Sequence, residues 1–205
     1  MSHDVDAIAD RADMARLAGG HDAALNDLMT RHGERLFHYL TRQLGNETEA
    51  EDCAQETFVR VYQHRAKFKP DAKFSTWLYT IATNLVRDIW RKRGRRPETT
   101  LDERLPDGGL SADEGLMQDE RAAEVRRAVQ ALPEDLRAPL VLFEFENLAQ
   151  TEIARILKCT PKAVEVRIYR ARRRLRETLR LLSEHFGHDE DQDGAAQSPA
   201  QQQVN

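Results

Sequence analysis

Residues 74–93 read FSTWLYTIATNLVRDIWRKR, and this stretch decides the fold class that we expect. On a helical wheel of about 100° per residue, its apolar and polar side chains separate onto opposite arcs. The pattern predicts a helix that buries one stripe in a core. The apolar arc holds Phe74, Trp77, Leu78, Ile81, Ala82, Leu85 and Ile89. The polar arc holds Thr76, Thr80, Thr83, Asn84, Arg87 and Arg91, with Tyr79, Val86 and Trp90 at its border.

The polar arc of this helix carries side chains that suit nucleic acid. Hydroxyls and amides bond base edges, aromatic rings stack on bases, and arginine and lysine bind phosphates. The helix ends in a cationic run at residues 91–96, which Pro97 closes. The solvated back of a core helix would look similar, so the helix alone leaves both interpretations open.

The distribution of charge along the chain favours a polyanion as partner. The 205 residues have a net charge of −4, which by itself argues against nucleic acid. However, residues 87–96 carry six basic residues against one acid, and residues 158–180 carry nine against two. Residues 98–124 carry nine acids against two arginines. Two basic patches with an acidic spacer predict a bipartite polyanion binder.

The cysteines and the apolar runs indicate the compartment that we expect. Cys53 and Cys159 are the only cysteines, and no CxxC or His/Cys cluster accompanies them. We therefore expect reduced thiols and no metal site. No apolar run approaches the roughly 18 residues of a membrane span, and Met1–Arg16 lacks a signal-peptide core. We expect a cytoplasmic protein without membrane insertion, cofactor or catalytic residues.

The fold class that we predict is all-α: two small helical domains, a helical bundle and a helix-turn-helix, joined by a flexible acidic linker. Apolar residues repeat at three and four, and strict alternation never lasts. The predicted helices span residues 1–18, 22–43, 47–65, 74–93, 119–132, 134–144, 148–157 and 161–182. The predicted parts are an N-terminal extension 1–20, a first domain 21–96, the linker 97–118, a second domain 119–182 and a disordered tail 183–205.

The helix expected at residues 47–65 has two distinct faces. One face carries small and apolar side chains, and the other carries acids and amides around one valine. This outer face is either a plain solvated surface or a docking surface for a protein with a basic groove. Its members are Asp52, Gln55, Glu56, Val59 and Gln63.

The helices expected at residues 148–157 and 161–182 form a helix-turn-helix pattern. A connection of three residues separates them, and Thr160 is a good N-cap before Pro161. The corner of a helical bundle has the same spacing, but a basic outer face on the second helix favours DNA binding. That outer face holds Lys162, Val166, Tyr169, Arg170 and Arg173.

Four stretches in this order resemble the extracytoplasmic-function sigma factors, the small two-domain initiation subunits of bacterial RNA polymerase. Residues 50–58 are similar to the polymerase-docking motif of that family, and residues 74–84 to its promoter-melting helix. Residues 132–137 and the helix-turn-helix are similar to its −35 domain. The resemblance covers about residues 15–182. It implies a sigma factor that directs core polymerase to −35 and −10 elements and melts DNA.

The resemblance also implies roles for individual residues and partners. The partners are the clamp helices of the large polymerase subunit, promoter DNA and an anti-sigma factor, in a stress response. Asp52, Gln55, Glu56 and Val59 would contact polymerase. Phe68, Thr80, Asn84, Arg87, Arg91 and Lys92 would contact the −10 element, with Phe68 and Asn84 around a flipped base. Lys162, Glu165, Val166, Tyr169, Arg170, Arg173 and Arg174 would contact the −35 element, the last two at phosphates.

The chain departs from the family pattern at Ala149, where a serine or threonine often caps the first helix of the pair. Losing that cap costs about 1 kcal/mol unless Asn147 substitutes. Glu165 and Val166 also replace basic or hydroxyl groups, so the promoter sequence cannot be copied from a relative.

Two other functions were weighed against the sigma factor. A one-component helix-turn-helix regulator would bind duplex operator as a dimer, but no dimer seam is evident and the outer face of residues 50–63 would go unexplained. A metal-dependent nucleic-acid enzyme would use His21, His32, His38 or Cys53. Their spacing places no ligand pair on one exposed helical face, so we expect a protein that is not an enzyme.

Overall fold

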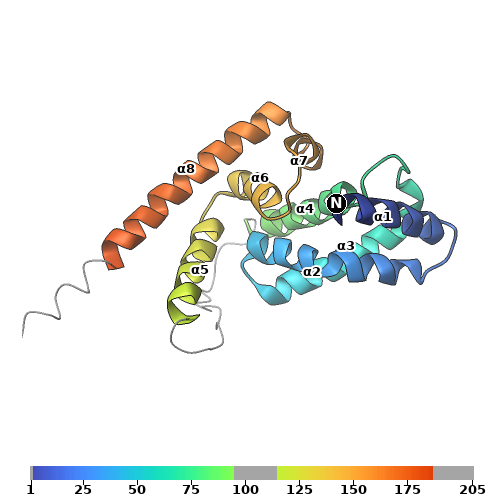
Figure 1. Cartoon of the computed structure of the whole chain (residues 1–205), viewed down its shortest axis with the longest axis horizontal. Coiled ribbons are helices and arrows are strands. Elements are labelled where there is room, and N and C mark those ends of the chain that lie inside the picture. The colour runs from blue at the N-terminus through green and yellow to red at the C-terminus, as the bar shows by residue number, and fades with distance from the viewer. Residues whose placement is uncertain (1, 95–114, 187–205) are drawn as a thin grey trace, which may run out of the picture.

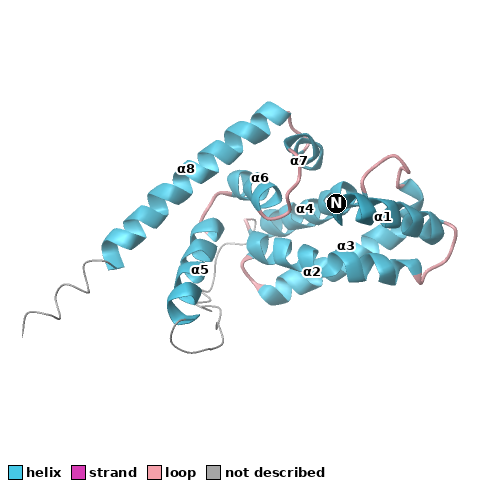
Figure 2. Cartoon of the chain, viewed as in Figure 1, coloured by secondary structure: helices cyan, strands magenta, loops and turns pink. Residues whose placement is uncertain are grey.

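The computed structural model describes residues 2–94 and 115–186, and every regular element within them is helical (Figures 1 and 2). This confirms the all-α prediction. The first half contains α1 (Ser2–Ala18), α2 (Ala24–Leu44), α3 (Glu47–Gln63), the single turn η1 (Arg65–Lys67) and α4 (Phe74–Arg93). The second half contains α5 (Gly115–Gln130), α6 (Glu134–Glu144), α7 (Gln150–Leu157) and α8 (Pro161–Phe186).

Local sequence explains where the helices begin and end. Gly45 ends α2 in the left-handed region at φ 74°, and the Asn46 side chain accepts a hydrogen bond from the Glu49 N–H at the start of α3. Thr160 caps α8 by accepting from the Ala163 N–H at 3.1 Å. Two predicted boundaries were wrong: α5 begins at Gly115, inside the expected linker, and α8 continues to Phe186, inside the expected tail. The remainder of the expected linker and tail, residues 97–114 and 187–205, lies outside the described residues.

Helix α1 is part of the first bundle because its apolar side packs on α2. Met14 and Leu17 are fully buried, and the Arg31 guanidinium reaches across to Asp10 at 2.5 Å and Asp13 at 2.8 Å. Burial alone would lower the pKa of Arg31, but the hydrogen bonds to the two carboxylates outweigh it and raise the pKa. The residues expected to form an extension therefore contribute to the core.

The buried stripe of α4 is rotated relative to the wheel prediction. Tyr79, Thr83 and Val86 are buried, although they were placed at the border or on the polar arc. The cause is α2, whose Tyr39 hydroxyl lies 2.8 Å from the Thr83 Oγ1 and whose ring meets the Tyr79 ring edge-on at 5.1 Å. A buried hydroxyl is tolerated when it is paired, so threonine can face the core here.

The second half packs α6, α7 and α8 around one another, with α5 against α8. Pro139 lies buried inside α6, which continues through it from Glu134 to Glu144. The core between these helices is aliphatic and consists of Val141, Leu142, Ile153, Ile156, Val164 and Ile168. This core fixes α7 and α8 relative to each other and so determines which side of α8 is exposed.

Candidate functional site

The outer face of α3 is bare, as the sequence predicts. Asp52, Gln55 and Glu56 are exposed, and the Val59 side chain is 46% exposed. The Glu56 carboxylate accepts from the Arg60 Nε at 2.8 Å on the same helix. This surface offers carboxylates and amides around one apolar side chain, which are complementary to a basic surface on a partner.

The opposite face of α3 holds Cys53 in the core. Burial raises the pKa of the Cys53 thiol to about 12, so this cysteine stays protonated and unreactive. Cys159 is also a free thiol, half-buried in the turn before α8.

The polar side of α4 is only partly open. Asn84 is half-buried, and the Thr80 hydroxyl donates to the Thr76 carbonyl at 2.6 Å within the helix. Arg87 approaches Glu134 of α6, with 3.7 Å between Nε and Oε1. The C-terminal turn is more exposed: there the Arg91 guanidinium pairs with Asp88 at 2.6 Å, and Lys92 is exposed.

Phe68 belongs to an aromatic cluster at the beginning of α4. Its ring centroid lies 5.3 Å from that of Trp77 and 6.2 Å from that of Phe74. His32 packs on the other side of Phe74 at 5.0 Å and bonds Asp10 at 2.8 Å. Phe68 remains half-buried, so one part of the ring packs in the cluster and the other meets solvent.

The turn between α7 and α8 has the geometry of a helix-turn-helix. Lys158 takes a left-handed conformation at φ 54°, which reverses the chain. Ala149 begins α7 without a side-chain cap, but its N–H donates to the Glu152 Oε2 at 2.9 Å. Glu152 thus supplies half of a capping box where the usual hydroxyl is missing. Asn147 instead occupies a left-handed position at φ 53° before α7.

The outward side of α8 presents the residues expected to contact the −35 element. Tyr169 is 61% exposed and Val166 is 37% exposed. Arg170, one turn after Val166, is also exposed. Lys162 pairs with Glu165 at 2.9 Å at the first turn of the helix. These side chains lie on the exposed side of α8, with Phe143 and Gln150 beside Val166 and Tyr169.

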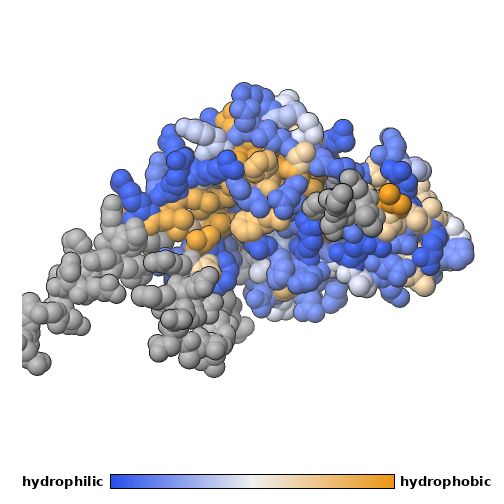
Figure 3. Space-filling model, in the orientation of Figure 1, coloured by the Kyte–Doolittle hydropathy of each residue, from blue (hydrophilic) through white to orange (hydrophobic). Residues whose placement is uncertain are grey.

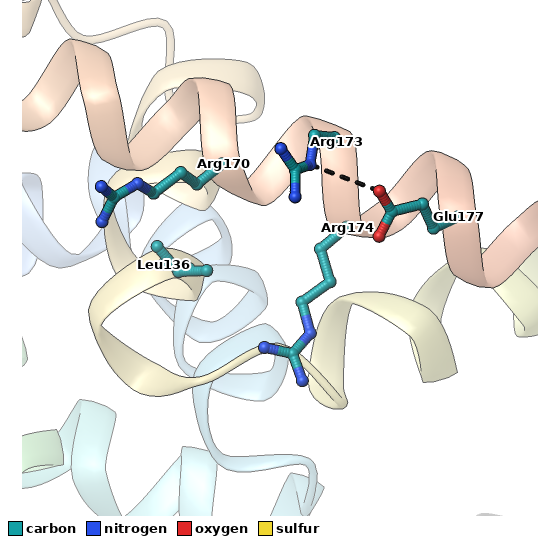
Figure 4. A pocket seen from close by; sticks show the side chains of 5 residues that line it. All are labelled: Leu136, Arg170, Arg173, Arg174 and Glu177. Atoms are coloured by element: carbon teal, nitrogen blue, oxygen red, sulfur yellow. Dashed lines mark ion pairs between the residues drawn. The ribbon is translucent and has the colours of Figure 1, made fainter.

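Three arginines of α8 surround an open hollow against α6, with a volume of about 620 Å³. Figure 4 shows Arg170, Arg173 and Arg174 spread around Leu136, with Arg173 directed at Glu177. The Arg173 Nε lies 3.3 Å from the Glu177 carboxylate, and both side chains are largely exposed. Such a cationic hollow can bind phosphate oxygens by charge-assisted hydrogen bonds.

The surface changes character along α8. Figure 3 shows hydrophobic surface between α5 and α8, whereas the first half of the chain is mostly hydrophilic in this view. Leu175 and Leu179 are half-buried, while Leu181 and Val125 are exposed. The second half of α8 therefore carries hydrophobic surface as well as the exposed Arg174, Arg176 and Arg180.

The histidines weighed for a metal site have other contacts. The His21 Nδ1 lies 3.3 Å from the Arg16 carbonyl, and His38 lies 3.8 Å from Glu34. Within residues 2–94 and 115–186 no group of three or more His, Cys, Asp or Glu could hold a metal ion.

Sequence reasoning missed a set of residues that join the two halves of the molecule. The Tyr79 hydroxyl of α4 donates to the Glu146 Oε2 at 2.5 Å, and both groups are buried. Arg137 of α6 donates to the Gln43 carbonyl at 2.5 Å and lies over the Trp90 ring. Helical periodicity within one element cannot reveal contacts between residues more than forty positions apart.

Known proteins share both halves of this arrangement. Residues 28–96 match the family Sigma-70 region 2, and residues 122–175 match the family Sigma-70, region 4. The RNA polymerase sigma-H factor of Pseudomonas aeruginosa is 34% identical over 177 residues, which cover 82% of this chain and 92% of the relative. The ECF RNA polymerase sigma factor SigW of Bacillus subtilis is 33% identical over 175 residues, covering 80% and 92%. The chain belongs to the extracytoplasmic-function RNA polymerase sigma factors.

Solved structures agree with this assignment. CnrH, in complex with the cytosolic domain of CnrY, superimposes with a TM-score of 0.65 at 30% identity, covering 84% of this chain and 98% of CnrH. RpoE of Bartonella quintana, in complex with the anti-sigma factor NepR, shares the fold with a TM-score of 0.60 at 22% identity.

The sigma factor is thus a subunit that directs RNA polymerase to promoters. Its family is one of transcription initiation factors rather than enzymes. A one-component regulator is not favoured, because the matched relatives span both halves of the chain. No helix in the described part of the chain is long and apolar enough to cross a membrane.

Proposed function

We propose that the sigma factor docks on core polymerase through the outer face of α3 and opens promoters through α4. Asp52, Gln55, Glu56 and Val59 would contact the clamp helices of the large subunit. The observation that carries this proposal is that all four are exposed on one side of a helix whose other side is core. Exposed carboxylates on one side of a helix can pair with a basic groove on a protein partner.

The −10 element would bind the polar side of α4 and the loop before it. The Asn84 amide has both a donor and an acceptor for a base edge, and the Phe68 ring edge can wall in an unstacked base. Thr80 and Arg87 lie one turn to either side of Asn84, and Arg91 and Lys92 continue the cationic side toward phosphates. Binding energy at these groups would offset the few kcal/mol needed to unstack a base.

The −35 element would bind the outward side of α8 in the major groove. Lys162, Glu165, Val166, Tyr169 and Arg170 lie on the first turns of this helix, where recognition helices contact bases. Arg173 and Arg174 lie further along, beside the cationic hollow, and would hold phosphates.

The domains of the sigma factor would be residues 21–96, supported by α1, and residues 119–182. A linker at residues 97–118 would join them, and residues 183–205 would form a tail. An anti-sigma factor is the regulatory partner that the family leads us to propose, in a stress response. We place the protein in the cytoplasm because polymerase and DNA are there.

The docking proposal is tested by charge reversal on α3. The double variant Asp52→Arg with Glu56→Arg should lose co-purification with core polymerase and run-off transcription. Its circular dichroism should stay unchanged, because both side chains are exposed and the lost Glu56–Arg60 pair is a surface pair worth well under about 1 kcal/mol.

A matched control is available outside residues 50–63. Glu34→Arg with Glu47→Arg makes the same change in net charge at exposed positions. This control should bind polymerase normally. Unaltered polymerase binding by the folded Asp52/Glu56 variant would contradict the docking assignment.

A further inference from the structure

The first turns of α8 carry an exposed acid and an exposed aliphatic side chain on a surface that is otherwise basic. Glu165 is one of only two acids among residues 158–180, and its side chain is 53% exposed. Val166, the next residue, is 37% exposed. A carboxylate on a surface that binds a polyanion opposes binding, because it repels the phosphates. Glu165 therefore carries information about the bases that this surface selects.

Lys162, one turn before Glu165, holds the carboxylate at the surface. The Lys162 ammonium donates to both carboxylate oxygens, at 3.0 Å and 2.9 Å. The lysine side chain is itself 76% exposed, so the pair stands in solvent. Lys162 offsets the charge that would repel DNA, and the carboxylate keeps lone pairs for a further donor. The pair thus presents a hydrogen-bond acceptor that can enter a groove.

An acceptor without a donor distinguishes the four bases in the major groove. Cytosine presents its N4 amino group as a donor, whereas guanine presents two acceptors and thymine presents the O4 acceptor. Adenine presents the N6 donor, but its N7 acceptor lies beside that donor and repels a carboxylate. Cytosine is therefore the base that suits Glu165, and repulsion disfavours the other three.

Val166 adds an apolar contact next to this acceptor. Consecutive residues of a helix are displaced by about 1.5 Å along its axis, so Glu165 and Val166 reach neighbouring base pairs. Val166 has no polar side-chain atom, and thymine is the base that presents a methyl group in the major groove. Both residues line a hollow of about 470 Å³, together with Tyr169 and with Gln150 at the start of α7. This hollow has room for the methyl group.

We propose that Glu165 and Val166 determine the −35 sequence of this sigma factor: Glu165 selects a cytosine through its N4 amino group, and Val166 selects a thymine at a neighbouring base pair. Lys162 is a positioning residue, because it holds the Glu165 carboxylate without contacting a base. This inference rests on the proposed contact of α8 with the −35 element. An ordinary surface pair between Lys162 and Glu165 would contribute little to stability and nothing to base preference.

The proposal is tested by selecting DNA with the holoenzyme. A promoter that the holoenzyme transcribes is randomised over about ten base pairs, one turn of the duplex, at its −35 position. The pool bound by core polymerase with the full-length sigma factor is then sequenced. It should show one position dominated by cytosine next to one dominated by thymine, on either strand.

The decisive variant is Glu165→Gln. An amide has a donor and an acceptor, which match N6 and N7 of adenine. The Glu165→Gln holoenzyme should therefore select adenine in place of cytosine, with a roughly tenfold change in preference at that position and the other positions unchanged. The matched control is Glu177→Gln, which removes the same charge from an exposed side chain further along α8. This control should select the wild-type sequence.

Lys162 is tested by base preference rather than by affinity. Lys162→Gln should flatten the preference for cytosine, because the carboxylate loses its partner. Lys162→Arg should restore the preference, because a guanidinium also pairs with a carboxylate. A uniform loss of affinity for all sequences by Lys162→Gln would make Lys162 a phosphate contact and overturn its positioning role.

Val166 is tested by a change in the DNA. Replacing the selected thymine by deoxyuridine removes only the methyl group and should weaken wild-type binding about fourfold in fluorescence anisotropy. Val166→Ser should bind the two duplexes equally. Equal binding of the two duplexes by the wild-type protein would refute the thymine contact.

The outcomes separate this inference from the proposed function. A wild-type pool without a cytosine position, or the same cytosine position for Glu165→Gln, would overturn the inference and leave the −35 contact in place. A pool enriched at no position would instead contradict the contact of α8 with the −35 element, and the inference with it.

Discussion

The polar side of α4 and the outward side of α8 have similar chemistry but different surroundings. Arg87 of α4 faces Glu134 from the other half of the molecule, whereas Lys162 and Arg173 of α8 pair only with Glu165 and Glu177 of their own helix. Asn84 is half-buried, while Tyr169 is 61% exposed. The α8 surface is therefore the more available of the two, and the α4 surface is partly covered at Arg87 by the second half.

This difference separates the two proposed DNA-binding surfaces by how exposed they are. The proposed −35 surface includes Tyr169, which is 61% exposed, whereas Asn84 of the proposed −10 surface is half-buried. The two surfaces should therefore respond differently to mutation, salt and pH.

The largest effect is expected on the available surface. Arg170→Ala should weaken binding of a −35 duplex selected by the holoenzyme by about 1–3 kcal/mol and relax preference at one or two base pairs, because a bidentate contact to guanine is lost. The matched variant Arg174→Ala should weaken all duplexes alike and reduce the salt slope. Fluorescence anisotropy over a panel of single-base variants measures both. A uniform loss from Arg170→Ala would assign that side chain to a phosphate.

A smaller effect is expected at the covered surface, on changing pH. Burial raises the pKa of Glu152, but the hydrogen bonds from Lys73 and the Ala149 N–H outweigh it, so the pKa lies below the ordinary 4.5. Because this pKa is depressed, the Lys73–Glu152 pair stabilises the contact between the two halves fully above about pH 4.5. That stabilisation is lost as the pH falls through the pKa of Glu152 in the folded protein. Lys73 is 65% exposed, so the screened contribution is below about 1 kcal/mol.

Energy transfer between dyes at Thr30→Cys on α2 and Arg126→Cys on α5, both exposed, measures this contribution, with Cys159→Ser removing the half-buried thiol. Lys73→Gln should lower the fraction of molecules whose two halves are in contact at neutral pH and flatten the loss of that fraction on acidification. Lys69→Gln, on an exposed lysine of the same loop, should behave as the wild type. Identical pH profiles for the two variants would show that Lys73 does not contribute to the contact between the two halves.

The positions of the helices were predicted well because each helix has its own local sequence pattern. The amphipathic period placed α4 at residues 74–93 and α6 at residues 134–144, as observed. The Thr160 cap and the exposed face of α3 were also visible in local spacing. These features depend on neighbours within about four residues, which a helical wheel represents.

The arrangement of one element against another was not predictable in the same way. Thr83 looked polar on the wheel, but Tyr39 pairs its hydroxyl in the core. Glu146, for which local spacing predicts no role, is buried against Tyr79. Both outcomes depend on residues more than forty positions away. The roles of Asn84 and Phe68 remain predictions, since their half-buried positions suit either a pocket or a core edge.

The measurement that tests the account most directly is the rate of promoter opening by Asn84→Ala holoenzyme. Permanganate reactivity of thymines near the −10 element reports strand separation. Asn84→Ala should bind polymerase and form closed complexes normally but open DNA more slowly, and a mismatched −10 segment should restore transcription because no base has to leave the stack. Asn26→Ala, an exposed asparagine of α2, is the control. Opening by Asn84→Ala at the wild-type rate would contradict the assignment of α4 as the melting helix.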